Sequence, residues 1–224
     1  MGRTILGLGA LAAAALWGAN VSAAECAPPQ MAKVVFSNVT PGIDPASFAA
    51  RPKTMYRHTE RYGRVEEEPN PATGAHLLVV VNEPDVWFVN LADRTGRHAV
   101  DPGPEFEFRA PIFSGADLPA VLGKLETGCE LDFVAQYAPR PVERVTLDGQ
   151  ALDKHQVSVG IDRIEVLVAP NARRVVSVGR YRNDRPVMVL RYLDYAVDLP
   201  PDLSLFAKPE GIAFRSAAEA GRQP

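Results

Sequence analysis

Short apolar runs, each closed by a turn residue, constrain the fold of this chain more than any other feature. From Leu77 to Phe113 the runs are rich in Val, Phe and Trp, and the stretches NEPD, ADRTG and DPGPE separate them. Runs of this length and composition predict β-strands joined by tight turns. The pattern returns from Glu130 to Tyr195, with Asp148-Gly149 and Asn183-Asp184 as further turn signals. We therefore expect a β-meander over most of the chain.

The predicted fold class is mainly β (α+β), with about ten to eleven strands and two or more short helices. Outside Leu77–Phe113, strands are predicted at Met31–Val39, Thr54–Glu68, Leu131–Ala138, Val142–Leu147, Lys154–Ile161, Arg163–Ala169, Arg174–Tyr181 and Pro186–Tyr195. One helix is expected to start at Asp44-Pro45 and another to follow Ser114 as far as Leu125. Sequential strands with short loops pair antiparallel, and a flat sheet of this size would leave edges and one apolar face uncovered. The sheet should therefore curl into a barrel or half-barrel, or fold over as a sandwich.

The N-terminus is typical of an export signal. Arg3 precedes an uncharged apolar run from Ile5 to Trp17, and small residues then allow cleavage after Ala23 or Ala24. The run is shorter than the roughly 20 residues that a membrane-spanning helix needs, although a retained anchor is the competing interpretation. We expect a signal peptide over residues 1–24, one domain over 25–215, and a flexible tail over 216–224. The mature protein should have no transmembrane span and should lie in the periplasm.

Two cysteines, Cys26 and Cys129, remain after this cleavage. Cysteines of an exported chain meet an oxidising compartment, so a Cys26–Cys129 disulfide is expected. Two free thiols are the alternative, and the absence of a C-x-x-C motif argues against a redox enzyme.

Charge and motifs argue against several functional classes. The formal net charge is −3 without a long block of either sign, which does not suit nucleic acid. The four histidines have no ligand-like spacing, and neither a G-x-S-x-G motif nor a glycine-rich phosphate loop occurs. We therefore predict no metal, no cofactor and no enzymatic activity. Arg174, Arg180 and Arg182 could form a basic patch for another envelope protein, or simply part of a mixed-charge outer face.

The C-terminal stretch Leu190–Ile212 resembles the signature of the LolA-like superfamily of periplasmic lipoprotein carriers. A strand ending in Tyr-x-Asp-Tyr, a proline-marked exit and Leu-Phe-x-x-Pro-x-Gly carry the resemblance, at Tyr192, Asp194, Tyr195, Pro200, Leu205, Phe206, Pro209 and Gly211. The order of the Lys53–Arg61 strand and of the stretch with Trp87 and Val89 is also similar. The resemblance implies an incomplete antiparallel barrel with helices over an apolar cavity. It supplies no ligand-binding residue that matches one to one.

An aromatic and aliphatic set is the candidate lining of such a cavity: Trp87, Phe88, Phe106, Phe108, Phe113, Met188, Leu190 and Tyr192. Alternate residues of a strand face the same side, so members of the set can converge on the concave face. The same residues would equally suit an ordinary packed core.

The leading hypothesis is a non-enzymatic periplasmic protein that binds a lipid or a lipoprotein acyl chain in the concave face. One alternative is a structural or protein-interaction module of the cell envelope without a small ligand. Another is a hydrolase that uses carboxylates and a histidine such as His98.

Overall fold

One open sheet of twelve strands organises the protein, in the order β12-β6-β5-β4-β3-β2-β1-β11-β10-β9-β8-β7. The computed structural model describes residues 26–104 and 107–215. The strands are β1 Met31–Asn38, β2 Lys53–His58, β3 Tyr62–Glu67, β4 Leu77–Asn82, β5 Asp85–Asn90, β6 Thr95–Val100, β7 Glu143–Leu147, β8 Gln150–Val159, β9 Asp162–Ala169, β10 Arg174–Arg182, β11 Arg185–Leu199 and β12 Ala213–Arg215. All neighbours pair antiparallel except β12, which runs parallel to β6. The predicted antiparallel sheet is confirmed, and β12 and β7 form its two free edges.

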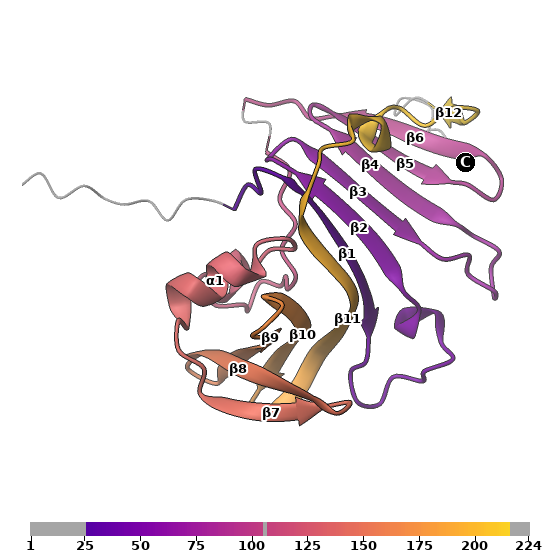
Figure 1. Cartoon of the computed structure of the whole chain (residues 1–224). Helices are drawn as coiled ribbons and strands as arrows, with labels where there is room; N and C mark the ends of the chain where they lie inside the picture. The colour runs from indigo at the N-terminus through magenta and orange to yellow at the C-terminus, as the bar shows by residue number, and fades with distance from the viewer. Residues whose placement is uncertain (1–25, 105–106, 216–224) are drawn as a thin grey trace, which may run out of the picture.

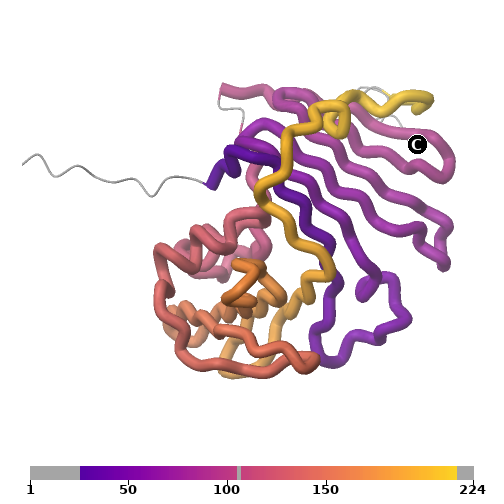
Figure 2. Tube along the Cα trace, in the orientation of Figure 1, coloured from indigo at the N-terminus to yellow at the C-terminus, as the bar shows by residue number. Residues whose placement is uncertain are grey.

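The long strand β11 joins two parts of the sheet. In Figure 1, β1–β6 spread as one twisted layer, whereas β7–β10 curl away on the other side of β11. Figure 2 follows the chain as it leaves β11 and passes along the β1–β6 layer to β12. The sheet is therefore curled but not closed.

Two-residue turns connect several strands as the sequence predicts. Asp148 and Gly149 have φ values of 50° and 76°, and Asn183 and Asp184 have φ values of 47° and 60°. Positive φ at both central residues is the mark of a type I′ turn, whose twist matches that of the flanking strands. The predicted long strand Thr54–Glu68 is wrong, because the chain turns at Thr59 (φ 51°) and forms the β2–β3 hairpin.

Residues 107–129, here called the crossing segment, run across the concave face without joining the sheet. The expected strand before Phe113 is absent there, and Pro111 makes only an isolated bridge to Glu126. The expected helix up to Leu125 shrinks to a 3-10 turn, η2 Leu122–Lys124. Pro119 explains the loss, because its ring lacks an N–H and does not suit a helix interior.

The α-helix α1, Glu130–Tyr137, replaces the strand predicted at Leu131–Ala138. Its buried residues follow helical spacing, with Glu130, Phe133 and Val134 facing inward. Glu130 and Asp132 suit the positive end of the helix dipole, and Pro139 follows where the helix ends. The helix signals were therefore present in the sequence, and the strand prediction was wrong.

The expectation of two or more short helices is not confirmed. Within residues 26–104 and 107–215, α1 is the one α-helix, and the rest are 3-10 turns: η1 Phe48–Ala50, η2 and η3 Leu203–Phe206. The helix expected at Asp44 does not form. The Asp44 carboxylate accepts a hydrogen bond from Ala46 N, 2.9 Å away, and this bond closes a local turn instead of starting a helix. No described helix is both long enough and apolar enough to cross a bilayer.

The two larger hydrophobic cores of the described residues lie on opposite faces of the sheet, and a third, smaller core groups Leu152, Ala169 and Val176 of β8–β10. The first is built from β1 and β9–β11 on the concave side, filled by the crossing segment and α1, with Phe113, Leu122 and Leu125 almost fully buried. The second lies on the other face of β1–β6, where Phe206 of η3 packs over Trp87 and neighbouring side chains. The concave face is therefore partly filled by the chain itself.

Candidate ligand-binding cavity

An apolar cavity of about 250 Å³ remains between the concave face and the crossing segment. Its lining residues are Phe36, Asn38, Ala49, Lys53, Met55, Ala110, Pro111, Ile112, Thr127, Met188, Leu190 and Tyr192. Most of them are hydrophobic, as is usual for small-molecule sites, with a few polar groups that could orient a ligand.

Strand register places the floor of the cavity. Phe36 of β1 lies opposite Tyr192 of β11 on one side and opposite Lys53 of β2 on the other. Side chains directly opposite each other share a face, and so do residues two positions apart in one strand. The same face therefore carries Met55 on β2 and Leu190 on β11. The crossing segment forms the roof with residues 110–112 and Thr127.

Two polar side chains enter this lining from the strands. Lys53 Nζ lies 3.8 Å from Glu67 Oε1 and 5.1 Å from the centre of the Phe48 ring. Asn38 Oδ1 accepts hydrogen bonds from the Thr40 backbone N at 3.0 Å and from Thr40 Oγ1 at 2.5 Å. Among the described residues that line the cavity, none is an aspartate or a glutamate.

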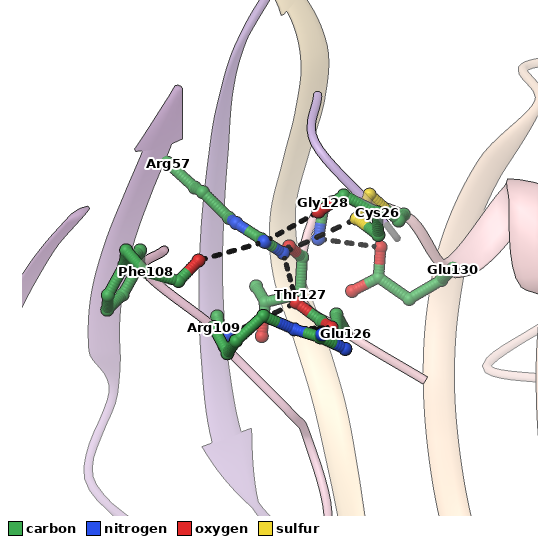
Figure 3. Close-up of polar contacts among 10 residues, drawn as sticks. Cys26, Arg57, Phe108, Arg109, Glu126, Thr127, Gly128 and Glu130 are labelled. Carbon is green, nitrogen blue, oxygen red and sulfur yellow. Dashed lines mark hydrogen bonds and ion pairs between the residues drawn. A yellow bond between two sulfur atoms is a disulfide. The ribbon is translucent and has the colours of Figure 1, made fainter. Parts of the chain in front are cut away.

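A buried ion pair fixes the roof to the sheet. Arg57 of β2 and Glu126 of the crossing segment have side chains only 1% and 0% exposed, with Arg57 Nη1 2.8 Å from Glu126 Oε2. Arg57 Nη2 also donates to the backbone oxygens of Cys26 at 2.7 Å and Phe108 at 3.2 Å, so one guanidinium joins three segments (Figure 3). Burial lowers the pKa of Arg57, and the Glu126 carboxylate opposes that shift. Arg109 Nε donates to Glu126 Oε1 at 2.5 Å from the solvent side.

The predicted disulfide is confirmed and lies beside this pair. Cys26 and Cys129 are bonded, which joins the first described residue to the residue before α1. Glu130 follows and is fully buried; its carboxyl accepts hydrogen bonds from the hydroxyls of Tyr192 and Tyr195 and from Gly128 N, at 2.7, 3.0 and 3.0 Å. Burial raises the pKa of the Glu130 carboxyl, against the effect of these donors. Burial also raises the pKa values of both tyrosines, and the neighbouring Glu130 carboxylate adds to the effect.

These buried ionisable groups hold the roof in place. Each of Arg57, Glu126 and Glu130 has its charge or its oxygens engaged by protein groups, and none lines the cavity. Across the described ranges, no group of three or more His, Cys, Asp and Glu side chains could hold a metal ion. The arrangement suits non-covalent binding of an apolar group.

Three predicted cavity residues line the cavity, and one lies in the core that supports it. Met188, Leu190 and Tyr192 contribute to its lining. Phe113 lies in the first core, 2% exposed. Phe108 belongs to the crossing segment and packs on Gly63 of β3.

The remaining members of the predicted set lie elsewhere. Trp87 belongs to the second core and stacks on His98, with ring centres 5.6 Å apart. Phe88 is the next residue on the strand, so it points to the other face, where it is 43% exposed. Phe106 lies outside the described residues. The predicted set is therefore split between two faces of the sheet.

The prediction missed several lining residues, although their pattern was visible. Val34 and Phe36 share one strand face, and so do Met55 and Arg57 in the next strand. This alternation does not reveal that β1 pairs with β11, and that pairing places Phe36 opposite Tyr192. Ile112 of the roof had no periodic signal at all.

The arginines considered for a basic patch are largely engaged. Arg180 is 6% exposed, and its Nη2 donates to Asp162 Oδ1 at 3.0 Å. Arg182 pairs with Asp162 at 3.2 Å and also with Asp117. Arg174 is half-buried. Arg180 therefore does not contribute to an exposed patch.

His98, the residue considered for a hydrolase, lies outside the cavity. Its Nε2 lies 2.6 Å from Asp85 Oδ1 on the neighbouring strand, and its ring stacks on Trp87. These contacts account for its position on the sheet.

Comparisons with known proteins add little to this geometry. No family model matches the chain, and no curated protein matches it. Among solved structures, it is similar to an uncharacterized conserved protein from Thermus thermophilus, with a TM-score of 0.46 and 12% identity over 84% of this chain and 91% of that one. It is also similar to PNGF-II in two space groups, with TM-scores of 0.33 and 0.32 and 12% identity over 86% of this chain. The chain spans about a third of PNGF-II (33% and 32%). At these TM-scores we draw no conclusion from the likenesses.

Proposed function

We propose that this protein is a non-enzymatic binder of a hydrophobic or amphipathic ligand, whose apolar part occupies the cavity between β1, β2, β11 and the crossing segment. The apolar lining of this cavity carries the proposal. An acyl chain buried there gains about 0.8 kcal/mol for each methylene removed from water. The export-type N-terminus, the disulfide and the LolA-like C-terminal stretch support a place in the periplasm and a lipid-derived ligand.

The volume of the cavity limits what it can hold. About 250 Å³ is below the range of roughly 300–1,000 Å³ that is usual for sites of drug-sized ligands. A single acyl chain, in part or whole, suits this space, whereas several chains of one lipoprotein would require the roof to move. The ligand class that the cavity favours is therefore a single-chain lipid.

Occupancy is the direct test. The protein is purified without detergent, studied by native mass spectrometry, and extracted with organic solvent for lipid analysis. Binding of the neutral fluorescent hydrocarbon diphenylhexatriene is then measured on the delipidated protein. We expect a co-purifying lipid and saturable probe binding. The absence of both would refute the proposal.

A pair of substitutions in one loop assigns the binding to this cavity. Ala49 is exposed and lines the cavity, so Ala49→Trp should obstruct it and reduce probe binding at least about tenfold. Ala46 lies in the same loop, is exposed and does not line the cavity, so Ala46→Trp is the matched control. Equal probe binding by both variants would place the ligand elsewhere.

A further inference from the structure

The charge of the cavity lining is one-sided. Of the twelve described residues that line it, Lys53 is the one with a formal charge. The other polar side chains are neutral: Asn38 and Thr127, and the hydroxyl of Tyr192, which is already used as a donor to Glu130. A ligand in this space meets hydrocarbon on most sides and a single ammonium group at one point.

The Lys53 ammonium forms only a long ion pair with Glu67. Its nearest carboxylate oxygen, Glu67 Oε1, is 3.8 Å away, whereas charge-assisted N–H···O bonds measure about 2.7–2.9 Å. By comparison, Lys33 on the opposite face of the sheet is 2.9 Å from its partner Asp194. Lys53 is also only 22% exposed, so water solvates it incompletely. The position favours an additional anion.

A second donor lies on the same face. Both hydrogen bonds of the Asn38 side chain use Oδ1 as the acceptor. Within the described part of the chain, Asn38 Nδ2 donates to no protein group, so this amide keeps two hydrogens for a ligand. Asn38 is two residues from Phe36, the cross-strand neighbour of Lys53, and therefore shares its face.

We propose that the ligand of this cavity is a single-chain amphiphile with an anionic head group, such as a long-chain carboxylate. The chain lies among Phe36, Met55 and Leu190, and the head group lies at Lys53 and Asn38. The ammonium and the amide would pair with two oxygens of a carboxylate, whereas a cationic head group would be repelled. This inference rests on the proposed function and names the chemical class of its ligand.

The test compares three head groups on the same alkyl chain: dodecanoate, 1-dodecanol and dodecyltrimethylammonium. Displacement of diphenylhexatriene from the delipidated full-length mature protein gives the relative affinities. Dodecanoate should bind about tenfold more tightly than 1-dodecanol, the effect expected of one charge-assisted contact. Dodecyltrimethylammonium should bind least. An alcohol that binds as well as the carboxylate would overturn the inference and leave the proposed function intact.

Substitutions then identify the cation. Lys53→Met keeps the apolar stem of the side chain and should reduce dodecanoate affinity to that of 1-dodecanol, with 1-dodecanol unaffected. Lys53→Arg keeps the charge and should retain most of the preference, which separates loss of charge from misfolding. Lys33→Met, on the other face, is the matched control and should leave the preference unchanged.

Glu67 provides a test in the opposite direction. Glu67→Gln removes the carboxylate nearest to Lys53 and should increase dodecanoate affinity without changing that of 1-dodecanol. An unchanged dodecanoate preference in both Lys53→Met and Glu67→Gln would overturn the assignment to Lys53. If none of the three compounds displaces the probe and Ala49→Trp does not affect probe binding, the proposed function fails as well.

Discussion

The hydroxyl of Tyr192 donates a 2.7 Å hydrogen bond to Glu130 Oε1, although the two residues are 62 positions apart in the chain. Tyr195 binds the other carboxyl oxygen at 3.0 Å. This buried carboxyl therefore links the start of α1 to β11, next to the cavity that Tyr192 lines. Because the link contains an ionisable group, its strength should depend on pH.

The free energy of unfolding should fall as pH rises through the pKa of folded Glu130. Burial raises this pKa above its ordinary value of 4.5, so the folded state binds the proton more tightly than the unfolded state. The stabilisation from this group is then complete below pH 4.5 and is lost as the buried carboxyl ionises. Urea unfolding of the wild type and of Glu130→Gln, from about pH 4 to about pH 8, measures the difference.

Glu130→Gln cannot ionise, so the wild type should lose stability relative to this variant as pH rises. Glu143→Gln, at a half-exposed position of β7, is the matched control and should not remove the pH dependence. A wild-type curve parallel to that of Glu130→Gln would contradict the prediction.

Gly63→Ala should displace the crossing segment. A Cβ on Gly63 would lie 2.3 Å from Cε1 of the Phe108 ring, well inside van der Waals contact. Overpacking of this kind costs about 1–3 kcal/mol, which thermal unfolding can measure. Gly123→Ala is the control, because its added Cβ would meet Leu118 at an ordinary 3.7 Å. Gly63→Ala combined with Phe108→Ala should recover part of the loss; no recovery would show that Phe108 is not the obstacle.

Arg57→Met should be among the most destabilising single substitutions in this protein. It leaves the buried Glu126 carboxylate without its partner on β2, and loss of one member of a buried pair costs about 3–5 kcal/mol. Arg51 pairs with Glu68 at 3.3 Å in a partly exposed position, so Arg51→Met should cost no more than about 1 kcal/mol. Chemical unfolding of the two variants makes the comparison, and equal losses would contradict the role of the buried pair.

Removal of the disulfide should destabilise the protein and loosen the roof first. The bond closes a loop between residues 103 positions apart, and loss of a cross-link of this span costs about 3–5 kcal/mol. In the double variant Cys26→Ser and Cys129→Ser, hydrogen exchange should rise more at Thr127 and Gly128 than in β9 and β10. A reductant should reproduce the effect in the wild type and have none in the double variant. Uniform exchange throughout would argue against a local role.

Much of the sheet could be predicted from local sequence. Turn pairs such as Asp148-Gly149 set the φ values of a hairpin within the turn itself, so their signal needs no distant residue. The stretch from residue 107 to 129 could not be assigned in this way. Its course depends on the contacts of Glu126 with Arg57 and of Glu130 with Tyr192, which join residues far apart in the chain. Helical spacing in α1 was readable but was mistaken for a strand.

The residues of the cavity could likewise be predicted only in part from local sequence. Alternation along one strand predicts that Met188, Leu190 and Tyr192 share a face, and all three line the cavity. It could not show that Trp87 would be covered by the C-terminal segment, or that Phe36 would lie opposite Tyr192. Aromatic content alone therefore selected residues from both faces of the sheet, whereas the lining required knowledge of strand order.

The position of β1 has a consequence for how the molecule folds. β1 pairs with β2 on one side, but its other neighbour is β11, and Lys33 and its partner Asp194 are 161 positions apart. Hairpins from β2 to β6 and from β7 to β10 can assemble while the chain is still growing, yet the two groups have no common strand until β11 follows. Contacts of such long range make folding slow. A chain that emerges from its N-terminus therefore carries an open β1 edge until β11 has emerged.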